Sequence, residues 1–597
     1  MNNLTHSEIE RLLNDTVAAI QSGSLDRAQS TCRQALSVLP DSDSRRAEAL
    51  SLLGLALADS DSEASVKALW QAVESDGREP NFRINLGRTL VRFGKVSEGI
   101  RQLESARRLS RNHVAAVEPL ADALTENNRP QDAVRILRKA LAQNPSVVLE
   151  RSLAKAYYAC GDLYAADDAI RSVMSRSSSP SRIDVFTTAR LALELLEFDR
   201  AEAAIESLLK KESTSPHIVS TAVRLFVWQG KHHRALEILS QALAVHPDNP
   251  QLLGLAVTHD DALSPRTLAR AEQLVAALPD DAEAKTSLLF PLARFYDRNK
   301  EYEHAWANMC RANSLTRLRR SGKDRVDPEA LPTLLRQRIE NSLTVASAVA
   351  RDSGPASGHV YLVGAPRTGS SLLQSILTAH DDVASVGERG ALLSHLLDIA
   401  DNCDIETFAT VREQLRSADI AGLARQGTGS TFVVDKAPHN FYVLPLIDSV
   451  HSEARFVNVL RDPRDVAISM LFHNFPEAFA EATDIASIES MLRVRLFGAK
   501  KYAEASLDIL SVHYEDFVDA PDMQGGRIAR YIGIEWDGRT LDPARRNAAV
   551  PTFSAGQVRR PIERPPADHW ARFAPFMGEA LEGLTSLADD MDSMKQS

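Results

Sequence analysis

The sequence predicts a multidomain chain, with an all-helical repeat array followed by an α/β domain built on a central parallel sheet. Three observations support this prediction. A small residue recurs at intervals of roughly 33 to 36 residues through the first half of the chain. The repetition stops near residue 320, and a strand, a glycine-containing loop and a helix are predicted from residue 359 onward. The length of 597 residues is also too great for a single hydrophobic core.

The repeated phrase of the first half is a short polar stretch that ends in a small residue. It reads GSLDRA, GKVSEG, NRPQDA, GDLYAA, LEFDRA and GKHHRA, and its last residues are Ala28, Gly99, Ala133, Ala166, Ala201 and Ala235, with Ala64, Ala271 and Ala305 continuing the spacing. Paired helices of this kind cannot bury their apolar faces alone, so stacked pairs form an α-solenoid with small residues where helices meet closely. The region resembles tetratricopeptide repeat (TPR) proteins over about residues 5–320, and we assign the array to residues 1–320.

The function of the array is left open between two alternatives. Concave solenoid surfaces commonly bind a peptide or a protein, which favours a role in recruiting such a ligand or partner protein. The other alternative is that the array only supports homodimer formation or covers the second domain.

The composition argues against nucleic-acid-binding, secreted and membrane-spanning classes of protein. The formal net charge of -11 argues against general nucleic-acid binding. The four cysteines, Cys32, Cys160, Cys310 and Cys403, form no CxxC pair, which favours a reduced compartment. The N-terminus MNNLTHSEIE does not read as a signal peptide, and no run of about 18 apolar residues predicts a membrane span. We therefore expect a cytoplasmic protein that does not bind membranes.

Residues 321–357 are predicted to connect the two parts. ALPTLLRQRIENSLTVASAVA has the pattern of a helix, and RDSGPASG is rich in residues that favour loops. The second domain is therefore assigned to residues 358–597.

The second domain opens with a pattern typical of a phosphate-binding loop. HVYLV is predicted to be a buried strand, Gly364 to Ser371 a loop, and the residues from Leu372 a helix. Loop amides and a helix N-terminus at such a place attract an anion, although a glycine turn without any ligand has the same pattern. Ser370 stands where a Walker A loop has its lysine, and the cation is Arg367 inside the loop. This difference argues against a P-loop kinase.

The loop resembles the 5′-phosphosulfate loop of sulfotransferases that use 3′-phosphoadenosine 5′-phosphosulfate (PAPS). Their pattern PR[ST]G[ST][ST] is matched by Pro366, Arg367, Thr368, Gly369, Ser370 and Ser371. The resemblance covers roughly residues 358–580 and is nearest to the tyrosylprotein and bacterial TPR-fused branches. It implies PAPS as donor, 3′-phosphoadenosine 5′-phosphate (PAP) as product, and no metal; the sequence also shows no metal-ligand cluster.

A second match lies about 90 residues further on, in ARFVNVLRDPRDVAISMLFH. It is predicted to be a strand, a turn at Asp462-Pro463 and a helix. Arg461 ends the strand and Ser469 lies in the helix, and a guanidinium can bind a phosphate through two hydrogen bonds. The resemblance assigns this pair to the 3′-phosphate of PAPS. The alternative is an exposed charged turn.

Two further segments extend the resemblance. QVRRPIERPPADHW is similar to a C-terminal segment that closes over the cofactor, and its matching positions are Ser554, Gln557, Val558, Arg560, Pro561 and Trp570. The family usually has Lys or Arg just before the tryptophan, whereas this chain has His569, so phosphate binding there is expected to be weaker or pH-dependent. Tyr514 matches a tyrosine near the adenosine and 3′-phosphate, with a core tyrosine as the alternative.

Sulfuryl transfer requires donors for the leaving phosphate and a base for the acceptor hydroxyl. The candidates for the first task are Arg367, Lys436, Ser371 and Ser554; Lys436 follows the predicted strand TFVVD, in a segment that matches the family's DK[MAD]P. The resemblance favours Glu388 as the base, with His439 and His473 as alternatives because imidazole titrates near neutrality. A peptide or protein, a carbohydrate or a small hydroxyl compound all remain open as the acceptor. The alternative to an enzyme is a TPR adaptor whose second domain binds PAP or PAPS without catalysis.

Overall fold

A computed structural model describes residues 6–127, 129–177, 179–195, 197–280, 282–320, 330–349, 358–385, 390–425, 430–475, 477–543, 545, 561–562 and 569–593. The chain divides into two compact units, Met1–Thr188 and Ala189–Ser597. The division falls within helix α11 (Arg182–Glu194). The predicted boundaries at residues 320 and 357 adjoin ranges outside the described residues, so the predicted domain limits stay a prediction.

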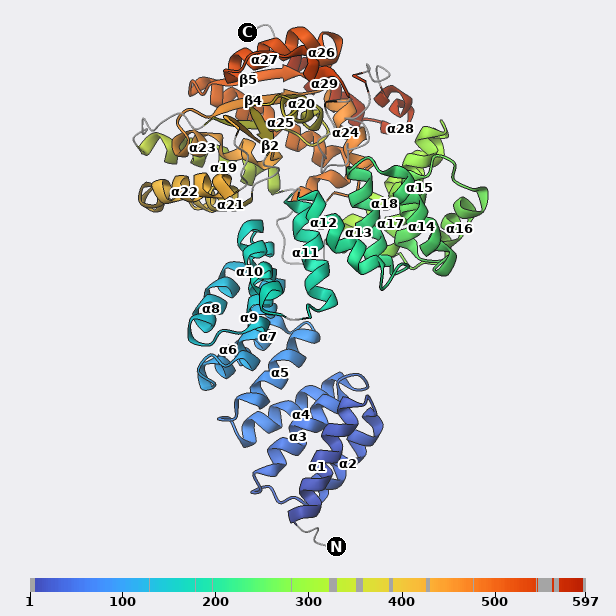
Figure 1. Cartoon of the computed structure of the whole chain (residues 1–597), viewed down its shortest axis with the longest axis vertical. Helices are drawn as coiled ribbons and strands as arrows, with labels where there is room; N and C mark the ends of the chain where they lie inside the picture. The colour runs from blue at the N-terminus through green and yellow to red at the C-terminus, as the bar shows by residue number, and fades with distance from the viewer. Residues whose placement is uncertain are drawn as a thin grey trace. The chain divides into compact units, whose positions relative to one another are not determined.

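Antiparallel helix pairs make up the described residues before 321, as the repeat pattern predicts (Figure 1). In the first unit they are α1 (His6–Gln21), α2 (Leu25–Val38), α3 (Arg45–Leu57), α4 (Ser62–Ser75), α5 (Pro80–Arg92), α6 (Val96–Leu109), α7 (Val114–Glu126), α8 (Pro130–Gln143), α9 (Val147–Ala159) and α10 (Leu163–Arg176). After α11 the second unit continues with α12 (Phe198–Leu209), α13 (Pro216–Trp228), α14 (His232–Val245), α15 (Pro250–His259), α16 (Pro265–Ala277), α17 (Glu283–Arg298) and α18 (Tyr302–Arg320).

The recurring small residues occupy the fourth position of most second helices in these pairs. Ala28 in α2 and Ala133 in α8 are fully buried there, and a side-chain carbon on Gly99 in α6 would meet Val91 at 2.6 Å. In α4 the equivalent position is Ser65, which is fully buried and donates to the Gly54 carbonyl oxygen, rather than the neighbouring Ala64 that the spacing predicted. A small residue therefore allows the helices to approach closely in α4 too, although it is serine there instead of alanine.

The second unit contains the predicted parallel sheet. Its strands are β1 (His359–Gly364), β2 (Val383–Ser385), β3 (Phe432–Asp435), β4 (Arg455–Leu460) and β5 (Ile509–His513), in the order β2-β3-β1-β4-β5. Every neighbouring pair is parallel, and Gly364 at the end of β1 pairs with Val459 near the end of β4. The carboxyl ends of the strands therefore share one edge, where α/β proteins place their ligand sites.

The remaining described elements are helical. They are α19 (Leu331–Ala348), α20 (Ser370–Leu377), α21 (Gly390–Asn402), α22 (Ile405–Arg425), η1 (Pro438–Val443), α23 (Leu444–Val450), α24 (Pro463–Leu471), η2 (Glu477–Thr483), α25 (Ile485–Glu504), α26 (Tyr514–Asp519), α27 (Pro521–Ile532), η3 (Gly538–Leu541), η4 (His569–Arg572), α28 (Ala574–Met577) and α29 (Ala580–Ser593). Among the described residues, no helix combines the length and the apolar character needed to cross a bilayer.

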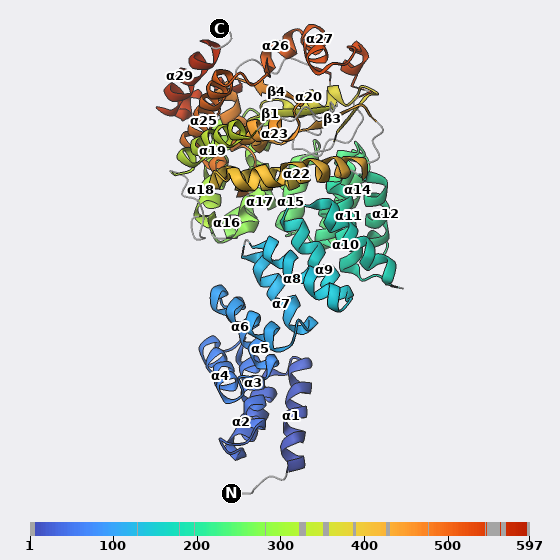
Figure 2. The ribbon, with the colours of Figure 1, turned by 90° about the vertical axis from the view of Figure 1, so that its left-hand side faces the viewer.

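Alternate residues of β1 enter two hydrophobic cores, one on each face of the sheet. Tyr361 and Val363 pack with α19, α21, α23 and α25, whereas Val360 and Leu362 pack with α20 and α27. Both faces of a parallel sheet must be covered in this way. The helix predicted in the connecting segment is α19, which lies beside α23 and α25 (Figure 2). Its residues Leu335 and Ile339 belong to the first of these cores.

The last helix pair of the array packs directly on the sheet-containing part of the second unit. Ala293, Ala305 and Met309 share a hydrophobic core with α24, α25, α28 and α29. Asn313 in α18 also donates to the Leu471 carbonyl oxygen at 2.8 Å, at the end of α24. The array is therefore in contact with the helix that follows β4.

Candidate anion-binding site

The loop between β1 and α20 has a backbone that two glycines make possible. Gly364 has φ +152°, and a side-chain carbon there would lie 2.6 Å from the Val459 carbonyl oxygen. Gly369 has φ +99°, and a side-chain carbon there would lie 2.3 Å from the Tyr514 ring. Both positions therefore exclude larger residues on two counts, backbone conformation and space. The predicted strand, loop and helix are present, but the strand extends to Gly364 and the helix begins at Ser370, two residues before the predicted start.

Helix α20 begins at Ser370, directly after this loop. The first amides of a helix have no partner within the helix, so those of Ser370 and Ser371 face the loop end with a partial positive charge. Thr368 closes the loop by donating from Oγ1 to the Ala365 carbonyl oxygen at 2.8 Å, and Pro366 is buried within it. The loop is thus a preformed place for an anion.

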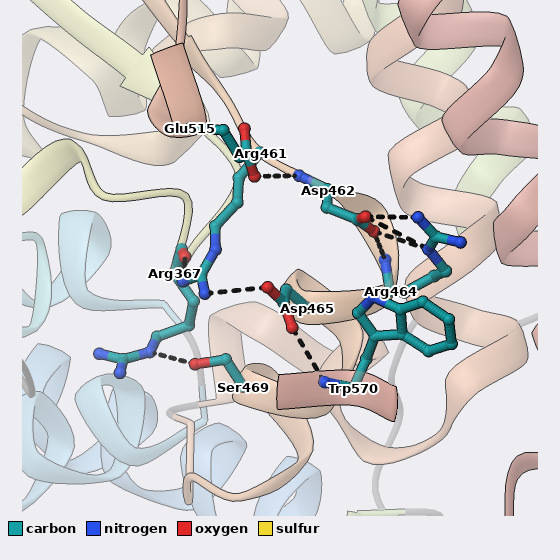
Figure 3. Close-up of polar contacts among 8 residues, drawn as sticks. All are labelled: Arg367, Arg461, Asp462, Arg464, Asp465, Ser469, Glu515 and Trp570. Atoms are coloured by element: carbon teal, nitrogen blue, oxygen red, sulfur yellow. Dashed lines mark hydrogen bonds and ion pairs between the residues drawn. The ribbon is translucent and has the colours of Figure 1, made fainter. Parts of the chain in front are cut away.

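Arg367 and Ser469 meet across the loop (Figure 3). The Arg367 Nε donates to Ser469 Oγ at 2.8 Å, which joins the loop after β1 to helix α24 after β4. Arg367 adopts a positive φ of 70°, an unfavourable conformation for arginine that places its guanidinium in this contact. In the sequence these two residues belong to separate motifs, and in the structure they are in contact.

Arg461 lies beside Arg367. Its Nη1 donates to the Arg367 carbonyl oxygen at 3.1 Å (Figure 3). Its guanidinium also lies over the Tyr514 ring at 4.8 Å. Burial, and then the charge of Arg461, lowers the pKa of Arg367 to about 10. Two neighbouring guanidinium groups in a buried place are stabilised by an anion that contacts both.

The Arg461 Nε is the donor in this network that points to a ligand. It is buried and has no hydrogen-bond partner among the described residues. A buried donor without a partner is costly, and a phosphate oxygen would satisfy it. The residues present therefore fit a phosphate-bearing ligand such as PAPS.

Carboxylates that the sequence analysis did not single out hold this arrangement in place (Figure 3). Asp465 accepts from Arg461 Nη2 at 3.3 Å and from the Trp570 amide at 3.0 Å. Glu515 accepts from the Asp462 amide at 2.9 Å. The i,i+4 spacing of Arg461 and Asp465 was a signal for the first contact. Nothing local in the sequence indicates the contact of Asp465 with the Trp570 amide.

The segment around Trp570 packs over α24. Arg464 lies over the Trp570 ring at 4.2 Å and pairs with Asp462. His569, which stands where the family usually has a basic residue, directs Nε2 to Asp297 of helix α17 at 3.0 Å. In the described structure His569 therefore contacts the array, and its assignment to phosphate binding stays a prediction.

Lys436 follows β3 and is buried with 6% of its surface exposed. Because β3 is parallel to β1, Lys436 lies towards the sheet edge that carries the loop. A buried lysine is rare unless a charged or polar group accompanies it. The next acid-base candidate, His439, packs against Phe479 with ring centroids 4.5 Å apart and the rings tilted by 37°.

His473 lies nearer to the loop than its position in the sequence suggests. Its Nδ1 donates to the Ser469 carbonyl oxygen at 2.7 Å. Burial, followed by the charges of Arg367 and Arg294, holds the pKa of His473 well below its usual range. The ring is therefore neutral near pH 7, with the lone pair on Nε2.

Arg294 is a further residue of this region that the sequence did not indicate. It lies on α17 in the array, donates from Nη1 to the Phe472 carbonyl oxygen at 2.9 Å, and thereby contacts the end of α24. Burial, and then Arg298 and Arg367, lowers the pKa of Arg294 to about 10. The array thus places a cation behind the loop.

Several predicted site residues lie outside the described residues. They are Glu388, Ser554, Gln557, Val558 and Arg560. Their predicted roles stay predictions.

Comparisons with known proteins find similarities in two parts of the chain. Residues 359–538 match the model of the sulfotransferase family, and residues 84–148 match a tetratricopeptide repeat. Protein-tyrosine sulfotransferase 1 of Danio rerio is 24% identical over 198 residues, which cover 30% of this chain and 55% of that protein. An uncharacterized protein of Aquifex aeolicus (strain VF5) is 23% identical over 413 residues, covering 65% of this chain and 53% of that protein.

The chain spans about half the length of these two curated relatives. Among solved structures, a tetratricopeptide repeat protein from Parabacteroides merdae is 15% identical, covers 42% of this chain and 97% of its own, and has a TM-score of 0.34. The two family matches fall on the two parts of the fold, one on the helix pairs and one on the sheet with its glycine loop. One part of the chain is thus similar to the sulfotransferase family and another part to tetratricopeptide repeats.

Proposed function

We propose that the chain transfers a sulfuryl group from PAPS to a hydroxyl acceptor. The observation that carries the proposal is the meeting of Arg367, Ser469 and Arg461 beside the loop that precedes α20. Two guanidinium groups and a buried unsatisfied donor at this edge of the sheet suit a ligand with more than one phosphate or sulfate group. The match of residues 359–538 to the sulfotransferase family supports the same activity.

The proposed binding roles follow the order of the loop and the two helices. The amides of Ser370 and Ser371, together with Arg367, hold the 5′-phosphosulfate. Arg461 and Ser469 hold the 3′-phosphate, and the Tyr514 ring lies against Arg461. Lys436, Ser371 and Ser554 donate towards the bridging oxygen as charge develops on it.

In the transfer step the acceptor oxygen forms a bond to sulfur while the bond from sulfur to the bridging phosphate oxygen breaks. PAP leaves with the electron pair of that bond, and the proton of the acceptor hydroxyl passes to a base. Glu388 is the base that the family resemblance favours. His473, which donates from Nδ1 to the Ser469 carbonyl oxygen, and His439 stay the histidine alternatives.

The donor assignment is tested by comparing PAP with AMP, which lacks the 3′-phosphate. PAP is expected to raise the unfolding temperature of the full chain, and AMP to raise it much less. Arg461→Gln should remove most of the response to PAP. Arg493→Gln is a matched control, because Arg493 pairs with Glu489 elsewhere in the same unit. Equal stabilisation by AMP and PAP in the wild-type chain would contradict the assignment of the 3′-phosphate.

The array is proposed to recruit a peptide, a protein or another hydroxyl-bearing acceptor. Its last helix pair packs on α24, so an acceptor bound there would lie near the proposed site. The alternative function, an adaptor that binds PAP or PAPS without transfer, is favoured by one observation. His569 is paired with Asp297 and does not join Arg367 and Arg461 beside the loop.

An assay for the release of PAP from PAPS distinguishes an enzyme from an adaptor that only binds the donor. The full chain is incubated with PAPS bearing labelled sulfate, with and without a lysate as the source of acceptors. An enzyme moves the label into a lysate component and releases PAP in proportion. Tight PAP binding with no transfer into any component would support the adaptor.

A further inference from the structure

A second cluster of chemically reactive side chains lies away from the proposed donor site. His359 is the first residue of β1, Asp419 lies in α22, and His451 lies between α23 and β4. All three are buried, with 3%, 7% and 1% of their surfaces exposed. Their ligand-type atoms lie within 4.8 Å of one another. The sequence shows no such cluster because its members come from three separate segments.

The contacts within this cluster are not those of a well-formed hydrogen-bonded pair. The His359 Nε2 lies 3.5 Å from Asp419 Oδ2, and the His451 Nε2 lies 3.2 Å from the same oxygen. Both ring nitrogens of His359 are buried without a hydrogen-bond partner among the described residues. The two rings are stacked with centroids 4.1 Å apart, so two imidazolium charges would repel each other strongly.

These separations are instead those expected between ligands of one metal ion. For zinc bonds of about 2.0 to 2.1 Å, neighbouring ligands of a tetrahedral site lie about 3.3 Å apart. The two distances from Asp419 Oδ2 to the imidazole nitrogens fall close to this value. We propose that His359, Asp419 and His451 bind a zinc ion, with two imidazole nitrogens and one carboxylate oxygen as protein ligands.

The place of the cluster in the fold indicates a structural role. His359 begins β1, whereas the anion-binding loop follows Gly364 at the other end of the same strand. A zinc ion at this place would tie α22 to the amino ends of β1 and β4. The His359 Nδ1 has no hydrogen-bond partner among the described residues, and such outer partners usually strengthen binding. We therefore expect an affinity roughly 10- to 100-fold weaker than that of a site with complete outer partners.

Zinc binding by the full chain tests the proposal directly. After metal removal, the wild-type chain is dialysed against Zn²⁺ and the bound zinc is measured. One zinc ion per chain is expected, together with a rise in the unfolding temperature that Mg²⁺ does not produce, because Mg²⁺ prefers oxygen ligands. The affinity should fall as the pH is lowered, since imidazole must lose a proton to bind metal.

Asp419→Asn keeps the shape of the side chain and removes its charge, so it should abolish the bound zinc. The matched control is His304→Gln, which removes an exposed histidine paired with Glu301 and should leave zinc binding unchanged. PAP binding by both variants separates this proposal from the donor site. If the wild-type chain binds no zinc, or no more than Asp419→Asn does, the proposal is wrong and the cluster is a histidine-carboxylate contact alone. If Asp419→Asn does not fold, the zinc content and the pH dependence of the wild-type chain decide.

Discussion

Arg367 donates a 2.8 Å hydrogen bond from Nε to Ser469 Oγ, across 102 residues of sequence. The bond joins the loop after β1 to the helix after β4, and these are adjacent strands of the sheet. It therefore links the residues assigned to the two ends of the proposed donor. Arg461 reinforces the link by donating to the Arg367 carbonyl oxygen.

Ser469→Ala should weaken PAP binding by about tenfold or more, because it removes a hydrogen bond that involves a charged group. Isothermal titration with PAP measures the change. Ser449→Ala is the control, since Ser449 is a buried helical serine that donates to the Pro445 carbonyl oxygen in the same helix. A Ser469→Ala variant with wild-type PAP affinity would show that this hydroxyl does not contribute to the site.

Gly369→Ala should lower both stability and PAP affinity. The φ of +99° costs a non-glycine residue roughly 1–2 kcal/mol, and the added carbon would meet the Tyr514 ring at 2.3 Å. Gly94→Ala is a matched control, because Gly94 has φ +79° and nothing within 4 Å of the added carbon. Urea unfolding and PAP titration of both variants separate the backbone cost from the clash. Equal losses of stability in the two variants, with PAP binding intact, would contradict the role of the Tyr514 contact.

The residues of the anion site that sequence could predict are those within local patterns. The loop from Gly364 to Ser371 and the segment around Arg461, which follows β4, each lie in a recognisable order of strand, turn and helix. The pairing of Arg461 with Asp465 was within reach because helical spacing places them together. Parallel strands bring both patterns to one edge of the sheet, so the approximate location of the site was also predictable.

Contacts between distant segments could not be predicted in the same way. The contact of Arg294 with the end of α24 depends on how the last helix pair packs on the second domain, which periodicity does not reveal. The pairing of His569 with Asp297 has the same origin. In the array, spacing identified Ala64 where Ser65 is the buried residue, because a period known only to within a few residues does not give exact register.

Arg294→Met should destabilise the second unit and change the environment of His473. The variant leaves the buried Phe472 carbonyl without its donor, a loss of about 1–3 kcal/mol in the free energy of unfolding. It also removes a positive charge that lowers the pKa of His473, so that pKa should rise. Urea unfolding measures the first effect, and an NMR titration of the His473 ring measures the second. Arg270→Met, which removes an arginine paired with Asp248 on the array, should change neither.

The pH dependence of stability should depend on His259, the last residue of α15. Burial, and then the charges of Arg294 and His232, lowers the pKa of His259 from 6.5 to about 4. Between these values the unfolded chain binds a proton that the folded chain does not, so stability present above pH 6.5 is lost as the pH falls towards 4. The shift corresponds to a loss of up to about 3 kcal/mol from this residue.

His259→Gln should therefore lose less stability than the wild-type chain when the pH is lowered from about 7 to about 4.5. Urea unfolding at the two pH values gives the comparison. His304→Gln should follow the wild-type curve, because His304 is exposed and lies beside Glu301. The burial of His473 acts in the same direction and remains in both variants, so some acid sensitivity persists. Identical curves for His259→Gln and the wild-type chain would contradict the lowered pKa of His259 in the folded state.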